Sequence, residues 1–98
     1  MKYEIELEEA CCLYARSKGA AAVKLENTGM EGIPDRMFIK QGGDTLFVEF
    51  KAPTKRGVLS KEQIFWRNFL FPKCLVCDSY ELFVTTFDKF IKKKEIEN

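Results

Sequence analysis

This 98-residue sequence has no histidine and no long hydrophobic run. Without an apolar stretch of about 20 residues, the chain offers no transmembrane helix. Residues 1–9 are acidic and lack the basic-then-apolar order of a signal peptide, so we expect a cytoplasmic protein. A surplus of charge is missing as well, since the net charge is +1. Any surface for an acidic partner therefore has to come from local clusters of basic residues.

Cysteine is scarce, and its spacing argues against a zinc site. The four cysteines are Cys11, Cys12, Cys74 and Cys77. A structural zinc ion needs four ligands, and no histidine can replace a cysteine here. Neighbours in a helix point about 100° apart, and residues three apart in a strand lie on opposite faces. We expect the cysteines to be reduced, buried and apolar in character.

Hydrophobic periodicity and turn residues predict the order of elements. We expect a helix over 3–18, strands over 21–25, 35–40 and 45–51, a helix over 60–70, a strand over 73–77 and a helix over 79–93. The large apolar residues of the second helix are expected to cover a face of the sheet; they are Ile64, Phe65, Trp66, Phe69 and Leu70. The order α-β-β-β-α-β-α predicts an α/β fold, with one mixed sheet flanked by helices in a single domain over 1–98.

The strand predicted over 45–51 carries the chemistry. Side chains alternate along a strand, so Glu49 and Lys51 share one face while Leu46, Val48 and Phe50 can enter the core. Asp35 begins the neighbouring strand, and Gly42-Gly43 forms the hairpin turn between the two. The Asp35 carboxylate can lie near Glu49 if the hairpin register allows.

Two adjacent carboxylates repel each other, and a divalent cation removes that repulsion. Mg²⁺ suits such a site because it prefers oxygen ligands, and a bound ion can polarise a phosphate. Lys51 could position a water or stabilise charge on the phosphate. On the strand pattern alone, a simple salt bridge between Glu49 and Lys51 on an exposed sheet face is the more ordinary interpretation.

Four short motifs follow one another along the chain: Glu8-Glu9-Ala10, Gly32-Ile33-Pro34-Asp35-Arg36, Val48-Glu49-Phe50-Lys51-Ala52-Pro53 and Ser60-x-x-Gln63. Together they resemble the virus-type replication-repair nuclease (VRR-NUC) domain of the PD-(D/E)xK superfamily. The resemblance extends from the first predicted helix to Ser79. It implies a restriction-endonuclease-like fold and an endonuclease that needs Mg²⁺ or Mn²⁺, of the stand-alone phage or bacterial type.

The resemblance also implies residue roles. Asp35 and Glu49 would be metal ligands, Lys51 the catalytic lysine and Gln63 a residue near the metal. Glu8 best matches the glutamate on the family's first helix, and the adjacent Glu9 is the alternative.

Several assignments remain open at this stage. Gln63 also fits a capping box with Ser60, in which its side chain folds back to the Ser60 amide. Arg36 could touch phosphate or form a salt bridge. Lys55, Arg56 and Lys61 could contact a DNA backbone, whereas the lysines at 92–94 could equally be a solvated helix end.

A short chain has little core, so we expect a homodimer, with apolar residues left over on the helix bearing Phe69 or on that bearing Phe87 and Phe90. The expected substrate is branched DNA such as a four-way junction, in the host cytoplasm if the protein is phage-encoded. We expect no membrane partner and no small-molecule cofactor. The alternatives are a monomeric nicking enzyme, a non-catalytic nucleic-acid-binding module on the same fold and a purely structural α/β domain.

Overall fold

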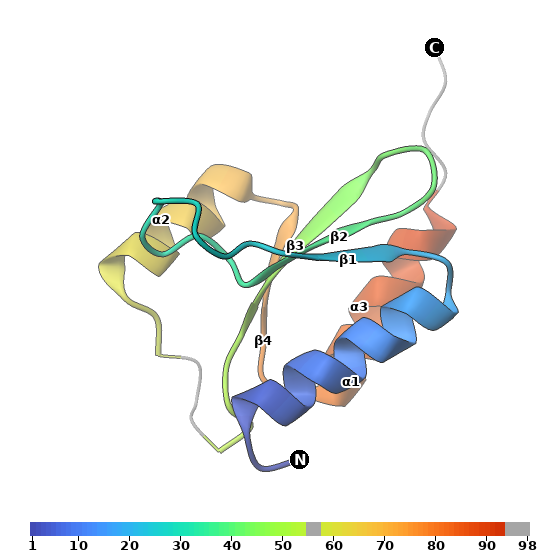
Figure 1. Ribbon diagram of the computed structural model, residues 1–98, viewed down its shortest axis with the longest axis horizontal. Helices are drawn as coiled ribbons and strands as arrows, with labels where there is room; N and C mark the ends of the chain where they lie inside the picture. The colour runs from blue at the N-terminus through green and yellow to red at the C-terminus, as the bar shows by residue number, and fades with distance from the viewer. Residues whose placement is uncertain (55–57, 94–98) are drawn as a thin grey trace.

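A computed structural model describes residues 1–54 and 58–93 and contains the expected elements in the expected order. They are α1 (Glu4–Ser17), β1 (Ala21–Lys24), β2 (Arg36–Ile39), β3 (Thr45–Phe50), α2 (Lys61–Leu70), β4 (Cys74–Cys77) and α3 (Tyr80–Lys92). The predicted α/β class, with one mixed sheet flanked by helices, is confirmed (Figure 1). None of the described helices is both long and apolar enough to cross a membrane.

The sheet has the strand order β1-β2-β3-β4. The first three strands form an antiparallel meander, and β4 runs parallel to β3. Gly42 and Gly43, with φ of 100° and 97°, make the turn between β2 and β3. These left-handed angles suit glycine because it has no Cβ. The resulting register pairs Arg36 with Val48, and this register decides which side chains share a face.

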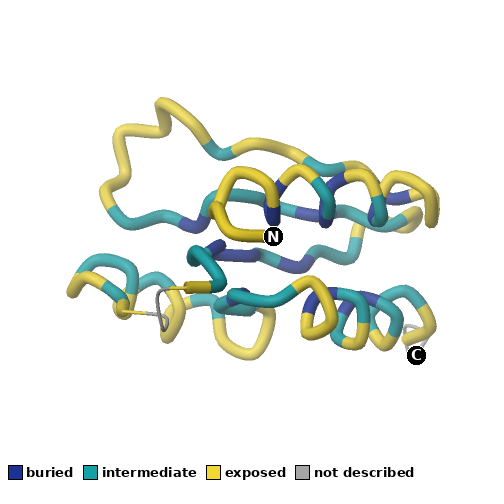
Figure 2. Tube along the Cα trace, turned by 90° about the horizontal axis from the view of Figure 1, so that it is seen from below, coloured by how far each residue is buried: buried dark blue, intermediate teal, exposed yellow. Residues whose placement is uncertain are grey.

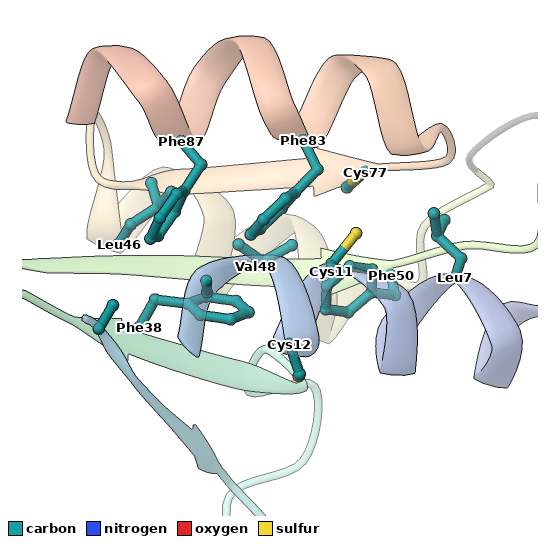
Figure 3. Packing of buried hydrophobic residues seen from close by; sticks show 12 residues of the cluster. Leu7, Cys11, Cys12, Phe38, Leu46, Val48, Phe50, Cys77, Phe83 and Phe87 are labelled. Atoms are coloured by element: carbon teal, nitrogen blue, oxygen red, sulfur yellow. The ribbon is translucent and has the colours of Figure 1, made fainter. Parts of the chain in front are cut away.

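The two faces of the sheet have different coverings. α1 and α3 lie together on one face, and α2 lies on the other (Figure 1). Buried positions gather where the sheet meets α1 and α3 (Figure 2). This core is built mainly from α1, β2, β3 and α3, and its largest side chains are Leu7, Phe38, Val48, Phe50, Phe83 and Phe87 (Figure 3). The alternation predicted for β3 is confirmed, since Leu46, Val48 and Phe50 are all buried there.

The expectation that α2 buries its large apolar residues is wrong for most of them. None of the residues of α2 is buried, and Phe65 and Phe69 are 58% and 68% exposed. Trp66 and Leu70 are half-buried, while Ile64 is exposed. The inward stripe of the helix begins with Glu62 and Gln63, so polar residues take the positions nearest the sheet. Helix α2 therefore contributes no buried side chain to the core.

The exposed large apolar residues of α3 are Tyr80 and Leu82, not Phe87 or Phe90. Phe87 is fully buried and Phe90 packs against the core, so the expectation that these residues could form an interface is wrong. The cysteines are all free. Cys11, Cys12 and Cys77 are buried as expected, but Cys74 is only half-buried because it lies on the face of β4 that α2 leaves partly open.

Candidate functional site

Asp35 and Glu49 come together because of the hairpin register. Arg36 pairs with Val48, so Asp35, one residue before, lies across from Glu49, one residue after. The Leu25 amide donates to the Asp35 carbonyl at 3.0 Å, which continues the β1–β2 ladder past the end of β2. Asp35 Oδ2 accepts a hydrogen bond from the Phe50 amide at 2.8 Å. Both carboxyl groups therefore lie at one end of the sheet, on the face opposite the core.

Burial and mutual repulsion disturb the ionisation of this pair. Glu49 is only 6% exposed. Desolvation, followed by the charge of Asp35, raises the pKa of Glu49 to about 8. Desolvation also raises the pKa of Asp35, although the hydrogen bond from the Phe50 amide opposes the shift. A nearby positive charge would favour the ionised forms of both carboxyl groups, and the raised pKa values therefore mark a candidate functional site.

Lys51 and Gln63 complete the arrangement. Lys51 Nζ lies 3.7 Å from Glu49 Oε2 and donates to Gln63 Oε1 at 3.0 Å. Gln63 Nε2 donates to Glu49 Oε2 at 3.0 Å. The amide of one glutamine thus binds both members of the ion pair. The isolated surface salt bridge considered from the sequence does not describe this group, because the pair is largely buried and joined to Asp35 and α2.

The two interpretations of Gln63 turn out to be compatible. Gln63 Oε1 accepts from the Ser60 amide at 2.9 Å, and the Gln63 amide donates to Ser60 Oγ at 3.1 Å. The predicted capping box is therefore present. Because the cap holds the side chain over β3, the same oxygen that closes the box also accepts from Lys51.

Gly32 allows α2 to approach the sheet this closely. Its φ is +81°, and a Cβ there would collide with Glu62 and lie 2.8 Å from the Gln63 amide nitrogen. The Trp66 indole donates to the Glu31 carbonyl at 3.1 Å and holds the same loop. The loop before Asp35 and the first turn of α2 are thus packed against each other, which fixes Gln63 relative to Glu49.

Glu8 is placed differently from the pair. It is buried, and its Oε2 accepts from Arg36 Nε at 2.7 Å and lies 3.4 Å from Lys24 Nζ. Arg36 pairs with Val48 and so faces α1, away from the Glu49 side of the sheet. Of the two roles considered for Arg36, the structure shows the salt bridge. Glu8 still acts on Asp35, whose pKa its charge helps to raise.

The remaining candidates are scattered. Glu9 is exposed on α1, and Lys61 is exposed at the start of α2. Lys55, Arg56 and Lys94 lie outside the described residues. The sequence reasoning missed Glu4, whose charge contributes to the raised pKa of Glu49. Its position one helical turn before Glu8 was the available signal.

The donor chemistry of Asp35 and Glu49 fits a hard divalent cation. Carboxylate oxygens are the ligands that Mg²⁺ prefers, and one or two carboxylates are enough because the ion keeps several waters. Within residues 1–54 and 58–93, no group of three or more His, Cys, Asp or Glu side chains could hold a metal ion. The protein would therefore supply two acidic ligands, and water or substrate oxygens the others.

The comparisons with known proteins do not identify a family. No protein-family model matches the chain, and a search of curated proteins gives no match.

Proposed function

We propose that this chain is a metal-dependent nuclease that hydrolyses phosphodiester bonds in DNA. One observation carries the proposal: the half-buried Asp35 lies opposite the buried Glu49, with Lys51 and Gln63 hydrogen-bonded beside Glu49. Placing two like charges together, one of them buried, destabilises a fold unless a cation or proton offsets them. A purely structural domain gains nothing from this arrangement, and a simple DNA-binding surface needs basic residues rather than paired carboxylates.

In this proposal Asp35 and Glu49 hold Mg²⁺ or Mn²⁺. Such an ion polarises a phosphate oxygen and lowers the pKa of a water molecule. Asp35 is kept in place by the Phe50 amide, which donates to Oδ2. Glu49 accepts from Gln63 through Oε2, so hydrogen bonds from the protein position both candidate ligands.

Lys51 is the residue assigned to the reacting phosphate. Its ammonium lies 3.7 Å from Glu49 and is oriented by Gln63. From there it can orient a water for attack on phosphorus and offset the negative charge that grows as one P–O bond breaks. Gln63 is a positioning residue, because its side-chain amide hydrogen-bonds to both Lys51 and Glu49.

We further propose a homodimer that acts on branched DNA such as four-way junctions, in the cytoplasm. A domain of 98 residues offers little surface to hold a duplex. Two identical sites related by a two-fold axis suit a substrate in which two strands are cut. The homodimer and the branched substrate extend the nuclease proposal, and separate measurements test them.

The test incubates the protein with labelled duplex, single-stranded, flap and four-way-junction DNA, with Mg²⁺, Mn²⁺ or excess chelator. We expect cleavage only with a metal, none with Asp35→Asn or Lys51→Ala, and normal cleavage with Lys18→Ala, an exposed lysine at the far end of α1. Cleavage in excess chelator would refute the metal mechanism. DNA binding without cleavage would instead support the non-catalytic module, and equal rates on duplex and junction would refute the branched substrate.

A further inference from the structure

The outer side of α2 carries two exposed phenylalanine rings, and the half-buried ring of Trp66 packs against them. We call Phe65, Trp66 and Phe69 the aromatic ridge. Phe65 and Phe69 are stacked, with ring centroids 5.8 Å apart and planes 13° apart. Trp66 meets both rings edge-on, at 5.5 Å and 5.6 Å. The rings hold one another in place, so the ridge is an ordered surface rather than separate flexible side chains.

We infer that the aromatic ridge is the surface through which two copies of this chain pair. The inference rests on the two-fold nuclease proposed above and names its interface. An isologous dimer requires one patch that is complementary to itself. A straight ridge on one helix meets that requirement when two copies of α2 pack antiparallel, because ridges of side chains then fit into the grooves beside them.

The area available is sufficient for the centre of such an interface. Phe65 and Phe69 are 58% and 68% exposed, and Met30, beside the loop that Trp66 binds, is 52% exposed. Taking about 200 Å² for each large side chain, these three residues offer roughly 350 Å² of apolar surface. A standard interface buries about 800 Å² per partner around a smaller apolar centre rich in aromatic residues and methionine.

The charges around the ridge are mixed in sign, which suits a surface that pairs with a copy of itself. Glu62, which packs against Gly32, and the exposed Glu31 lie where α2 meets the loop that carries Met30. Lys61 and Arg67 are exposed in the first and last turns of α2. A phosphate backbone laid across the rings would meet carboxylates as well as basic side chains and would gain little from this surface.

Pairing through α2 would also act on the candidate site. The inward stripe of this helix carries Gln63, and none of the residues of α2 is buried in the single copy. Covering the outer stripe would give α2 a second apolar surface to pack against. Gln63 would then be held over Glu49 and Lys51 by contacts on both sides of its helix.

The test compares the mass of three proteins by sedimentation and light scattering across about a hundredfold range of micromolar concentrations. The wild-type chain should approach twice 11.4 kDa. Phe69→Glu should weaken the dimer at least about tenfold. Leu13→Glu, on the outer side of α1, should leave it unchanged, although Leu13 is also 68% exposed. Circular dichroism checks that both variants fold, as expected for exposed positions.

A wild-type monomer throughout this range would overturn the inference, as would a dimer that Leu13→Glu breaks and Phe69→Glu does not. If the wild type is a monomer and Phe69→Glu weakens binding of a single-stranded oligonucleotide, the ridge stacks bases instead. Mass does not depend on cleavage, so the interface and the nuclease activity can fail independently.

Discussion

Replacing Gln63 by alanine tests whether one side chain serves both the helix cap and the candidate site. The substitution removes the hydrogen bonds to the Ser60 amide, the Lys51 ammonium and the Glu49 carboxylate. Ser60→Ala is the matched control. It removes only the hydroxyl that accepts from the Gln63 amide, so the Gln63 side chain keeps its partners at the site.

The magnitudes of the two effects differ enough to be measured. Loss of a serine cap costs about 1 kcal/mol. Loss of a hydrogen bond to a charged group costs about 1.5–3 kcal/mol, and Glu49 is too buried for water to replace its lost donor fully. We therefore expect Ser60→Ala to lower the free energy of unfolding by about 1 kcal/mol and Gln63→Ala by about 2–4 kcal/mol. In a domain of this size each kcal/mol lowers Tm by about 4–8 °C.

Thermal and urea unfolding of the two variants provide the assay, and a double-mutant cycle with Glu49→Ala isolates the contact at the site. We expect Gln63→Ala to reduce cleavage per folded molecule and Ser60→Ala to preserve it. Equal losses of stability in both variants, together with no coupling between Gln63 and Glu49, would show that Gln63 is only a capping residue.

Three further predictions follow from the same group of residues. The pKa of Glu49 is about 8 in the folded protein and about 4.5 in the unfolded chain, so the contribution of Glu49 makes stability fall as pH rises between these values. Mg²⁺ should therefore raise Tm more above this pH range than at its acid end. A similar rise in Tm for Glu49→Gln would contradict the assignment of Glu49 as a metal ligand. Lys51→Ala should abolish single-turnover cleavage. Most of the DNA affinity should persist in a binding assay, because phosphate contacts elsewhere on the protein supply that affinity. Near-normal turnover would remove Lys51 from the mechanism. Gly32→Ala should lower both Tm and cleavage, because the new side chain would displace Gln63. Gly29 has a similar φ of +73° but nothing within 4 Å of its Cβ position, so Gly29→Ala should lower the free energy of unfolding by the backbone cost alone, about 1 kcal/mol. Equal effects of the two substitutions would argue against the close packing of Gly32 on α2.

The fold and the carboxylate pair could be predicted from sequence because local rules determine them. Alternation along β3 fixed the face of Glu49, and the Gly42-Gly43 turn limited the hairpin to a register that brings Asp35 opposite it. Both signals lie within a short stretch of chain. The sequence also contained the capping box of Ser60 and Gln63, although only the structure shows that this box and the site share an oxygen.

The parts that could not be predicted depend on how distant elements meet. The motif on the first helix assigned Glu8 to the site. In the structure, however, Arg36 faces α1 and forms a salt bridge with the Glu8 carboxylate. The sequence left two expectations for the helix bearing Phe69, either to cover the sheet or to carry spare apolar residues, and only the structure shows that Phe65 and Phe69 point outward. Here the close approach permitted by Gly32 assigns the inner side of α2 to Gln63 and leaves the rings outside.

The absence of buried residues in α2 has a consequence for the kinetics of amide hydrogen exchange. Local opening of a segment costs the contacts that the segment loses, and α2 loses few apolar ones, whereas α1 gives up Leu7, Cys11 and Ala15 from the core. Amides of α2 should therefore exchange through small local openings, while those of α1 exchange only as the whole domain unfolds. Each such opening withdraws Gln63 from Glu49, so the complete site exists for a fraction of time set by this one helix rather than by the stability of the protein.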